Sequence, residues 1–473
     1  MTPLSADVCV MGAGPAGCVM AARLAQLGLA VCLVERETFP RHHLGESLSP
    51  GVLPLLATIG ARDTVEAAGF TPVRRVLSNW DGPLAERVDA SEQGLLVDRG
   101  RFDALLADRA RALGVEVMQP AVVREFAKDD DGWRLGVEAA GSLRHLRVRY
   151  LVDATGRAAA LAGRRRRTGP KTVAVYAYWE GKRLPAQPRI GAGANEWYWG
   201  VPLPDGLYNT LVFVDGSSLG GRGRLARETR FHELLGRAGL MDGCDEPRMV
   251  GRVLLADATP YLDDECVTRT QIKIGDSALA LDPLSSSGVQ KAIQSALSGA
   301  VVVNTLLRKP ENSDAAVRFY RESLAQASHR HRAWAAGHYA SVAAREHSPF
   351  WTDRSIPVGS PQPYVPPAPP EEMTARIASG APVQVSPDAE LIEVPRLGSD
   401  FVALGPALHH PALDGPVAYL GGWELAPLLR EVRPGMTPLQ VVQSWAPGVP
   451  AESGLAIAGW MLGRGILIPQ CES

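Results

Sequence analysis

The spacing of three glycines near the start of the chain restricts the folds that the chain can adopt. Residues 7–11 read as a buried strand, and Gly12, Gly14 and Gly17 form a G-x-G-x-x-G turn before a helix expected at residues 18–27. A second strand, expected at 30–34, is followed by Glu35, an acidic residue 18 positions after the last glycine. This order of strand, turn, helix, strand and acid predicts a Rossmann-type α/β fold that binds a dinucleotide.

Each glycine of the turn has a mechanical task in such a fold. The first permits the tight turn, the second lets the backbone approach a diphosphate, and the third allows the helix to pack closely on the strand. The helix N-terminus then presents free N–H groups and a positive dipole end to the diphosphate. The residues expected to contact the dinucleotide here are Gly12, Gly14, Ala16, Gly17, Glu35 and Arg36.

The composition narrows the expected partners to small molecules or another protein. The formal net charge is -2, and the basic residues are scattered apart from Arg164 to Arg167, so we expect no nucleic-acid partner. The six cysteines show no C-x-x-C spacing, and no carboxylate–histidine pattern indicates a metal site. Neither a signal-peptide pattern nor a membrane-spanning stretch is evident, so we expect a reduced, cytoplasmic protein without a membrane partner.

Four further motifs follow the glycine turn in order along the chain. They are residues 39–47 (FPRHHLGES), 98–103 (DRGRFD), 152–157 (VDATGR), and 275–276 (GD) leading into 282–288 (DPLSSSG). The set resembles the motifs of FAD-dependent aromatic hydroxylases and flavin-dependent halogenases. The resemblance implies a glutathione-reductase-like α/β fold with an inserted β-sheet that holds the substrate. It also implies FAD as the cofactor, dioxygen as co-substrate and an aromatic substrate.

The same resemblance implies roles for individual residues. Arg41 and Arg99 would contact the phosphates or the ribityl chain of FAD, and Asp276 would contact the ribityl hydroxyls. The loop from Pro283 to Gly288 would lie against the isoalloxazine ring. Residues 289–297 read as a helix whose N-terminal dipole would stabilise negative charge on a reduced flavin. The remaining expected cofactor contacts are Ser47 and Val289.

One segment separates two possible reactions. Trp197–Pro202 (WYWGVP) is similar to the W-x-W-x-I-P signature of the halogenases. Their early catalytic lysine has no counterpart, however, because the first lysine is Lys128 and only Arg74 and Arg75 occupy the expected region. An arginine cannot replace that amine, and Leu284–Ser287 lacks the glutamate of tryptophan halogenases. We therefore expect a monooxygenase that hydroxylates an electron-rich ring through a flavin C4a-hydroperoxide, with a halogenase of a phenol or pyrrole as the alternative.

An oxygen-activating flavin needs a site that excludes water. The residues expected to form the substrate pocket are Trp197, Trp199, Pro283, Ser286 and Gly288. The candidates for a general base, none of them singled out, are His42, His43, Glu46 and Asp282. NAD(P)H and a separate reductase both remain possible electron donors, since no second glycine fingerprint is evident.

A proline-dense stretch at 356–371 divides the chain, because proline cannot continue a helix or a central strand. We expect an FAD-binding domain at 1–355, with the inserted sheet at roughly 70–95 and 170–265, and a C-terminal module at 372–473. Helical patterns at 423–431, 439–445 and 452–464 before a short strand predict a winged-helix-like module.

The sparse basic residues of this module favour a peptide or protein as its ligand. A halogenase-like chain that lacks the lysine and carries such an extension resembles the monooxygenases of tryptophylquinone cofactor biogenesis. That resemblance implies a small polypeptide partner that is hydroxylated at a tryptophan side chain. A non-catalytic, flavin-stabilised maturation partner is the remaining alternative.

Overall fold

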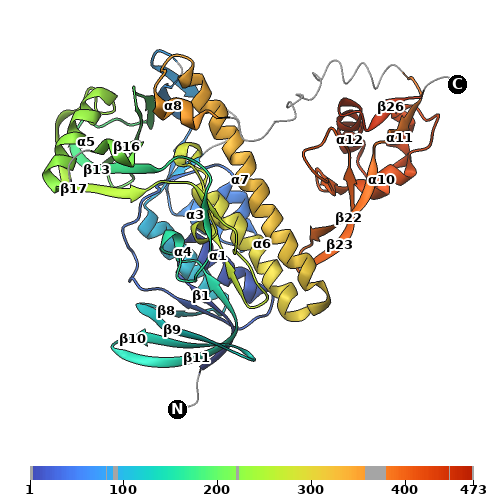
Figure 1. The fold of residues 1–473 in the computed structure, drawn as a ribbon, viewed down its shortest axis with the longest axis horizontal. Coiled ribbons are helices and arrows are strands. Elements are labelled where there is room, and N and C mark those ends of the chain that lie inside the picture. Colours follow the sequence, from blue (N-terminus) through green and yellow to red (C-terminus); the bar gives the residue numbers. More distant parts are fainter. Residues whose placement is uncertain are drawn as a thin grey trace. The chain divides into compact units, whose positions relative to one another are not determined.

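The computed structural model describes residues 4–80, 82–88, 94–219, 223–356, 380–446 and 448–470. The linker expected at 356–371 lies outside these residues except for Ile356, as does Cys471. The chain forms two compact units, both drawn in Figure 1. Unit 1 comprises Met1–Ser313, Tyr320–Val358 and Ser399–Phe401, and unit 2 comprises Asp314–Phe319, Gly359–Gly398 and Val402–Ser473.

A largely parallel sheet in unit 1 carries the glycine turn. Its order is β8-β2-β1-β11-β10-β9, with β19 also beside β11; β9 and β10 are antiparallel to their neighbours. The strands are β1 (Leu4–Met11), β2 (Val31–Val34), β8 (Glu116–Met118), β9 (Ala121–Asp129), β10 (Gly132–Ala139), β11 (Ser142–Asp153) and β19 (Gln271–Lys273). All four residues of β2 are buried, which explains its uninterrupted Val-Cys-Leu-Val sequence.

Helices pack beside this sheet. Helix α1 (Pro15–Gln26) contacts both α4 (Arg99–Ala112) and α6 (Gly288–Arg308). Helix α7 (Ser313–Ala343) runs alongside α6, as Figure 1 shows. The expected Rossmann-type arrangement is confirmed, and the cysteines at positions 9, 18 and 32 are buried in it as free thiols.

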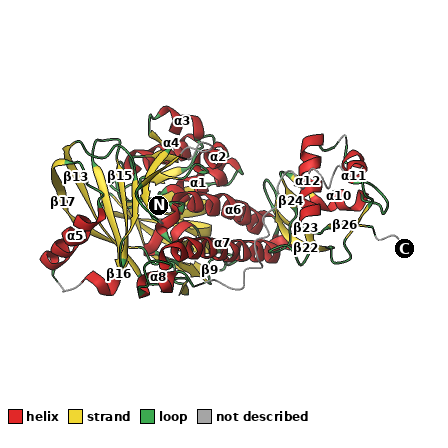
Figure 2. Ribbon diagram, turned by 90° about the horizontal axis from the view of Figure 1, so that it is seen from above, coloured by secondary structure: helices red, strands yellow, loops and turns green. Residues whose placement is uncertain are grey.

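A second sheet contains the residues expected to hold the substrate. Its order is β17-β13-β16-β15-β14-β5-β6, antiparallel except for the β14/β5 pair. The strands are β5 (Arg75–Asn79), β6 (Ala85–Val88), β13 (Thr172–Lys182), β14 (Arg189–Ala192), β15 (Glu196–Pro202), β16 (Tyr208–Asp215) and β17 (Asp245–Asp257). Helix α5 (Arg224–Ala238) lies beside this sheet in Figure 2.

Alternation along the strands gives this sheet two different faces. On β13, Val175 and Ala177 point toward α5 and join a core with Phe231. Ala174 and Tyr176 point to the other face, which packs with residues of α7 and of α8 (Pro349–Arg354). The second face is therefore the one that looks into the interior of unit 1.

Short elements make up much of the rest of unit 1. They are β3 (Ser47–Leu48), α2 (Val52–Ala57), α3 (Arg62–Ala67), β4 (Thr71–Val73), β7 (Gly94–Leu96), η1 (Gly156–Ala158), β12 (Arg165–Arg167), η2 (Gly216–Leu219), β18 (Tyr261–Asp263), η3 (Gly275–Ser277), β20 (Leu279–Ala280), η4 (Pro283–Ser285) and η5 (Pro310–Asn312). Among the described helices, none is long and apolar enough to span a membrane.

Unit 2 has its own core of strands and helices. Its elements are β21 (Val383–Val385), β22 (Glu390–Leu397), β23 (Val402–His409), β24 (Tyr419–Leu420), β25 (Trp423–Glu424), α10 (Leu425–Glu431), α11 (Pro438–Ser444), α12 (Ala451–Gly463) and β26 (Leu467–Pro469). The three helices and the last strand lie where the sequence predicts them. The β22–β23 hairpin was not expected. Trp445 and Met461 are buried at the centre of the core.

Candidate active site

The glycine turn is closely packed where the fingerprint requires it. A Cβ atom at Gly17 would lie 1.8 Å from the Gly12 carbonyl oxygen, and one at Gly12, whose φ is +97°, would lie 2.6 Å from the Ala154 oxygen. Gly14 is the N-cap of α1 and offers no side chain to the first turn. The nearest atom to a Cβ at Gly14 is Arg41 Nη2, at 3.8 Å. The turn is thus tight on its inner side and open at Gly14, as a diphosphate cradle must be.

Glu35 is oriented by backbone donors of the same turn. Its carboxylate is buried and accepts hydrogen bonds from Ala13 N at 2.8 Å and from Glu37 N at 2.9 Å. Each carboxylate oxygen keeps a further lone pair, so the group can still accept from a ribose hydroxyl. The side chain of the neighbouring Arg36 is 70% exposed and pairs with that of Glu37 at 3.3 Å.

Two arginines of the expected FAD site share one buried carboxylate. Arg99 forms a two-pronged ion pair with Asp103 and also donates to the Leu44 carbonyl at 2.9 Å. Arg41 pairs with the same Asp103 at 3.3 Å, and its Nη2 atom lies 3.8 Å from the position of a Cβ at Gly14. Arg99 therefore holds residues 39–49, which we call the early loop, in place. The guanidinium of Arg41 instead borders the opening of the turn.

The Gly275–Asp276 pair meets the glycine turn directly. A Cβ at Gly275, whose φ is +59°, would lie 3.1 Å from the Cβ of Ala16. Ile274 N donates to the carbonyl of Asp153, which joins this pair to the end of β11. The Asp276 side chain is 40% exposed and pairs with Arg157 at 3.5 Å. Enclosure by the surrounding protein raises the pKa of Asp276, although Arg157 opposes that shift.

Removal of the Asp276 carboxylate should weaken FAD binding without unfolding the chain. We expect Asp276→Ala to raise the dissociation constant of FAD about 10- to 100-fold, the value of a lost hydrogen bond to a charged group. Titration of the apoprotein with FAD measures the loss, and thermal unfolding of the apoprotein serves as the control. An unfolded variant with no change in flavin affinity would instead make Asp276 a structural residue.

The loop before α6 is held from both sides. Asp282 accepts from Leu284 N at 3.0 Å and from the Tyr339 hydroxyl at 2.9 Å. Burial raises the pKa of Asp282. Ser286 adopts a left-handed conformation with φ of +50°, which a serine holds only when its surroundings impose it. Asp282 is thus the cap that fixes the loop.

Helix α6 begins at the end of this loop with Gly288 and Val289. Ser287, its N-cap, makes no side-chain cap hydrogen bond to the first turn. Ser49 donates to Gln290 Oε1 at 2.6 Å, so the early loop, which also contains Ser47 in β3, meets the first turn of α6. The sequence motifs that are far apart in the chain therefore converge around one opening, and the residues present fit an FAD molecule there.

The two tryptophans of β15 have different environments. Trp197 is 2% exposed and stacks on Phe213 with ring centroids 3.7 Å apart, in a cluster that includes Trp80. The expectation that Trp197 lines the pocket is therefore wrong: its ring is part of the aromatic core. Trp199, two residues further on the same face, is only half-buried, and so is Tyr176.

Trp199 and Tyr176 lie in one row across the sheet. Both are paired in register with Leu211 of β16. Leu284, from the loop at 283–288 (the flavin loop), and Leu44, from the early loop, pack against the aromatic cluster that contains Trp197. This apolar, partly exposed row is the part of the sheet that faces the loop at 283–288. Its aromatic and aliphatic side chains are of the kind that contact an aromatic ring.

Glu46 connects the early loop with the sheet. Its buried carboxylate accepts from the Tyr178 hydroxyl at 2.8 Å, from Asn209 Nδ2 at 3.3 Å and from Gly45 N at 2.9 Å. Burial of Tyr178, and then the neighbouring Glu46 carboxylate, raise the pKa of the Tyr178 hydroxyl. With three donors around it, Glu46 is suited to fixing the loop against β13 rather than to removing a proton. The ring of His42, another candidate for the base, packs edge-to-face with the ring of Tyr178, and the ring centroids are 4.7 Å apart.

Lys291 is a residue that the sequence argument overlooked. It lies in the first turn of α6, three residues after Gly288, and its backbone N–H bonds to the Ser287 carbonyl. No acidic side chain in the described part of the chain pairs with its ammonium group. Burial lowers the pKa of Lys291 to about 8. The early part of the sequence gives no sign of this amine, because Lys291 follows the loop at 283–288 late in the chain.

Because the pKa of Lys291 is lowered, we expect its replacement to change the stability of the fold in a way that depends on pH. Below pH 8 the lysine is charged in both states, and the folded state bears the cost of burying the charge. Lys291→Met should therefore stabilise the protein by about 1–3 kcal/mol at pH 7, and the gain should shrink as the pH rises from 8 toward 10.5. Urea unfolding at several pH values measures this. Lys128→Met, at an exposed site of β9, is the control, and an equal gain at all pH values would contradict the explanation.

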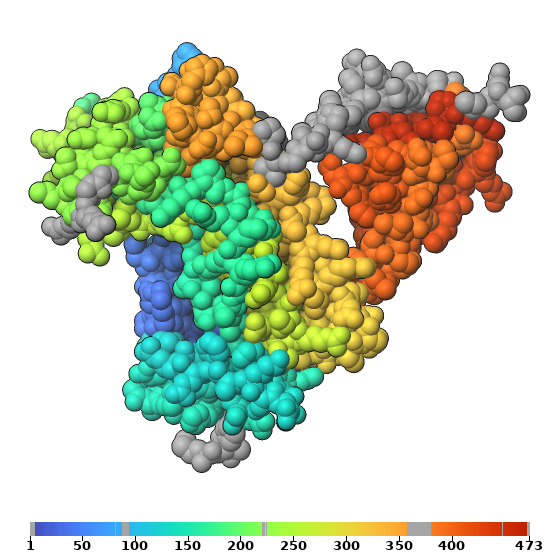
Figure 3. Space-filling view, in the orientation of Figure 1, coloured from blue at the N-terminus to red at the C-terminus, as the bar shows by residue number. Residues whose placement is uncertain are grey.

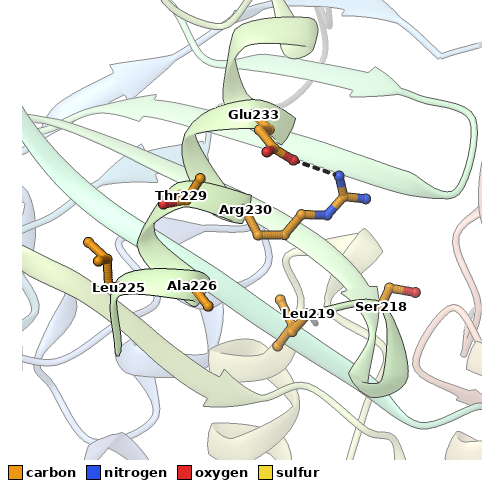
Figure 4. A pocket seen from close by; sticks show the side chains of 7 residues that line it. All are labelled: Ser218, Leu219, Leu225, Ala226, Thr229, Arg230 and Glu233. Atoms are coloured by element: carbon orange, nitrogen blue, oxygen red, sulfur yellow. Dashed lines mark hydrogen bonds and ion pairs between the residues drawn. The ribbon is translucent and has the colours of Figure 1, made fainter. Parts of the chain in front are cut away.

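A large hollow lies away from these residues. It has a volume of about 490 Å³ and sits between η2 and α5 (Figure 4). Its charged residues, Arg230 and Glu233, pair with each other at 3.0 Å. Leu219 belongs to the core on the α5 side of the sheet, the face opposite Trp199. The hollow is therefore not part of the candidate active site.

Comparisons with known proteins agree with this geometry. A family model described as an FAD binding domain matches residues 5–176. The tryptophan 2-halogenase of Chondromyces crocatus is 30% identical over 379 residues, which cover 75% of this chain and 71% of that protein. The structure of CmlS, a flavin-dependent halogenase, matches with a TM-score of 0.79 and 21% identity over 99% of this chain and 96% of that one.

A further solved structure is that of QhpG, a peptidyl tryptophan dihydroxylase essential for tryptophylquinone cofactor biogenesis. It matches with a TM-score of 0.71 and 29% identity over 98% of this chain and 99% of that one. The fold and the cofactor expected from the sequence are confirmed: the chain is an FAD-dependent enzyme of the kind that modifies aromatic rings. It belongs to the flavin-dependent halogenase superfamily.

Proposed function

We propose that this enzyme hydroxylates the ring of a tryptophan side chain in a polypeptide. The observation that carries the proposal is the similarity to QhpG, which has 29% identity over nearly all of both chains, whereas the halogenase CmlS has 21% identity over a similar extent. The similarity to the tryptophan 2-halogenase covers 75% of this chain. Both relatives have tryptophan in their names, which supports an indole ring as the substrate group.

The residues of the site would divide the work as follows. The turn at Gly12–Gly17, with Arg41 at its opening, would hold the diphosphate, and Asp276 would hold the ribityl chain. The loop at 283–288, fixed by Asp282, would support the flavin ring, and the dipole of α6 would stabilise its negative charge. When bound and reduced, FAD supplies two electrons and activates dioxygen, so that one oxygen atom enters the ring and the other leaves as water.

The apolar row on the sheet would position the ring and exclude water. Tyr176 and Trp199 offer aromatic faces, and Leu44 and Leu284 close the same cluster. Enclosure of the reacting groups favours transfer to the ring over loss of oxidant to solvent. Glu46, through Tyr178, would keep the early loop against this surface.

Halogenation is the second candidate, and two observations favour it. The curated relative with 30% identity is a halogenase, and Lys291 provides a partly buried amine in the turn that follows the flavin loop. Of the other lysines, Lys273 is in a buried ion pair, and the remaining four are exposed: Lys128, Lys171, Lys182 and Lys309. Arg75, one of the two arginines in the early region, is 60% exposed and pairs with Glu86. A halogenating form of this enzyme would therefore depend on Lys291.

Product analysis in the presence of bromide separates the two reactions. The enzyme is supplied with reduced FAD, dioxygen, bromide and either free tryptophan or a tryptophan-containing peptide, and the products are weighed by mass spectrometry. We expect oxygen in the peptide and no bromine, with the same product from Lys291→Met. Bromine incorporation that disappears in Lys291→Met would establish halogenation instead. A protein that binds FAD and the peptide but modifies neither substrate would be a non-catalytic maturation partner.

A further inference from the structure

A cluster of arginines borders the expected FAD site without belonging to it. Arg165–Arg167 form strand β12, all three exposed, antiparallel to β18. We call the cluster the arginine ridge. It consists of Arg157, Arg164, Arg165, Arg166, Arg167 and Arg332.

The ridge has more positive charges than nearby carboxylates neutralise. Asp264 pairs with both Arg164 and Arg166, at 3.6 and 3.3 Å, and Arg157 pairs with Asp257 at 3.7 Å and with Asp276 at 3.5 Å. In the part of the chain that the structure describes, no carboxylate pairs with Arg167 or Arg332. Arg332 lines a small pocket together with Thr168, the residue that follows Arg167. Burial and the nearby charge of Arg166 lower the pKa of Arg332. Such an arrangement costs stability and attracts an anion.

The ridge is continuous with Asp276. The guanidinium carbons of Arg157 and Arg165 lie over the ring of Tyr261, at 5.5 and 4.5 Å from its centroid. The Tyr261 hydroxyl donates to the backbone carbonyl of Asp276, and Arg157 pairs with the Asp276 carboxylate. Arg157 and Arg165 therefore place positive charge beside Asp276, and strand β12 continues from Arg165 to Arg167.

We propose that the arginine ridge is an electrostatic capture surface for the diphosphate of FAD as it enters the site. The diphosphate is doubly negative, and a cluster of like charges can raise the association rate of such a ligand by about 10- to 1,000-fold. The ridge guides the dinucleotide toward Arg41 and Gly14 and has no contact with the flavin ring. The inference rests on FAD as the cofactor and is independent of which group is transferred to the substrate.

Stopped-flow binding of FAD to the apoprotein tests the proposal. The variant Arg167→Gln/Arg332→Gln should lower the association rate constant about three- to tenfold at ~20 mM salt, with the dissociation rate unchanged. The difference should nearly vanish at ~500 mM salt, where exposed charges are screened. If the loss of Arg332 disturbs α7, the single variants Arg167→Gln and Arg167→Glu are compared instead. Arg167→Glu reverses the charge and should slow FAD association more than Arg167→Gln, which only removes it.

Arg134→Gln/Arg144→Gln is the matched control. It removes the same charge from exposed positions of β10 and β11, in the part of unit 1 coloured cyan in Figure 3, away from Asp153 at the other end of β11. The control should change the rate less than about twofold. Three results would overturn the proposal. They are an unaltered association rate constant for FAD in the ridge variants, a fall in that constant that is equal at both salt concentrations, and a fall no larger than in the control. The proposal is also overturned if the ridge variants bind FAD normally but accept electrons from NADPH or from an acidic reductase more slowly.

Discussion

Gly14→Glu is expected to give a folded, colourless protein. A Cβ at this position meets nothing closer than Arg41 Nη2 at 3.8 Å, so the chain can accommodate the side chain. The added carboxylate would occupy the opening expected to receive the diphosphate and would pair with the guanidinium beside it. Like-charge repulsion and lost space should weaken FAD binding by more than about 100-fold. Flavin absorbance of the purified protein and titration of the apoprotein with FAD measure the effect.

Gly337→Glu provides the matched control. This glycine lies in α7, is exposed and has open space around its Cα, so the same change in size and charge should leave FAD occupancy intact. If Gly14→Glu keeps its yellow colour and full occupancy, the cradle has been placed at the wrong turn. If Gly14→Glu fails to fold, Gly14→Asp is the milder variant to which the same prediction applies.

The second large effect concerns stability rather than the cofactor. Lys273 Nζ and Asp263 Oδ2 lie 2.6 Å apart, and each side chain is only 1% exposed. Lys273→Met would leave a buried carboxylate without its counter-charge, a change that typically costs about 3–5 kcal/mol. Equilibrium unfolding in urea should show this loss as a lower midpoint with little change in slope.

Two variants show whether the lost charge is the cause. Adding Asp263→Asn to Lys273→Met removes the uncompensated charge, so part of the stability should return. Breaking the exposed pair of Arg124 and Glu138 with Arg124→Gln should cost less than about 1 kcal/mol. An effect of Lys273→Met as small as that of the exposed pair would show that the buried pair is not the important interaction.

The FAD-binding part of the fold could be predicted because its signals are local. The strand, the turn and the helix around Gly12–Gly17 follow one another directly, and at Gly12 and Gly17 a close backbone contact excludes a side chain. The order of the later motifs then predicted that Asp276 and the loop at 283–288 belong to the same opening. The contacts between Gly275 and Ala16, and between Ser49 and Gln290, join these segments in the structure.

The environment of Trp197 could not be predicted from its strand. Alternation shows that Trp197 and Trp199 share a face, but not which residues cover that face. The cover over Trp197 includes Tyr339 and Trp351, which are more than a hundred residues away in sequence. Lys291 was overlooked for a related reason, since a catalytic amine was sought only at the position where the family carries one.

The β22–β23 hairpin of unit 2 was missed because its sequence argues against strands. Pro395 and Pro406 lie within it, and proline normally excludes a segment from a sheet interior. In a two-stranded hairpin each strand has a free edge, so a proline there need not cost a ladder hydrogen bond. The helices α10, α11 and α12 were predictable because each shows a helical pattern of apolar residues, and the residues buried from them meet in one core.

The source of the atom added to the tryptophan ring tests the central claim most directly. The enzyme, reduced FAD, bromide and the peptide are incubated under isotopically heavy dioxygen, and the modified residue is located by tandem mass spectrometry. We predict heavy oxygen on the indole ring of the peptide. Bromine on that ring, or oxygen that carries no label, would contradict the assignment as a hydroxylase.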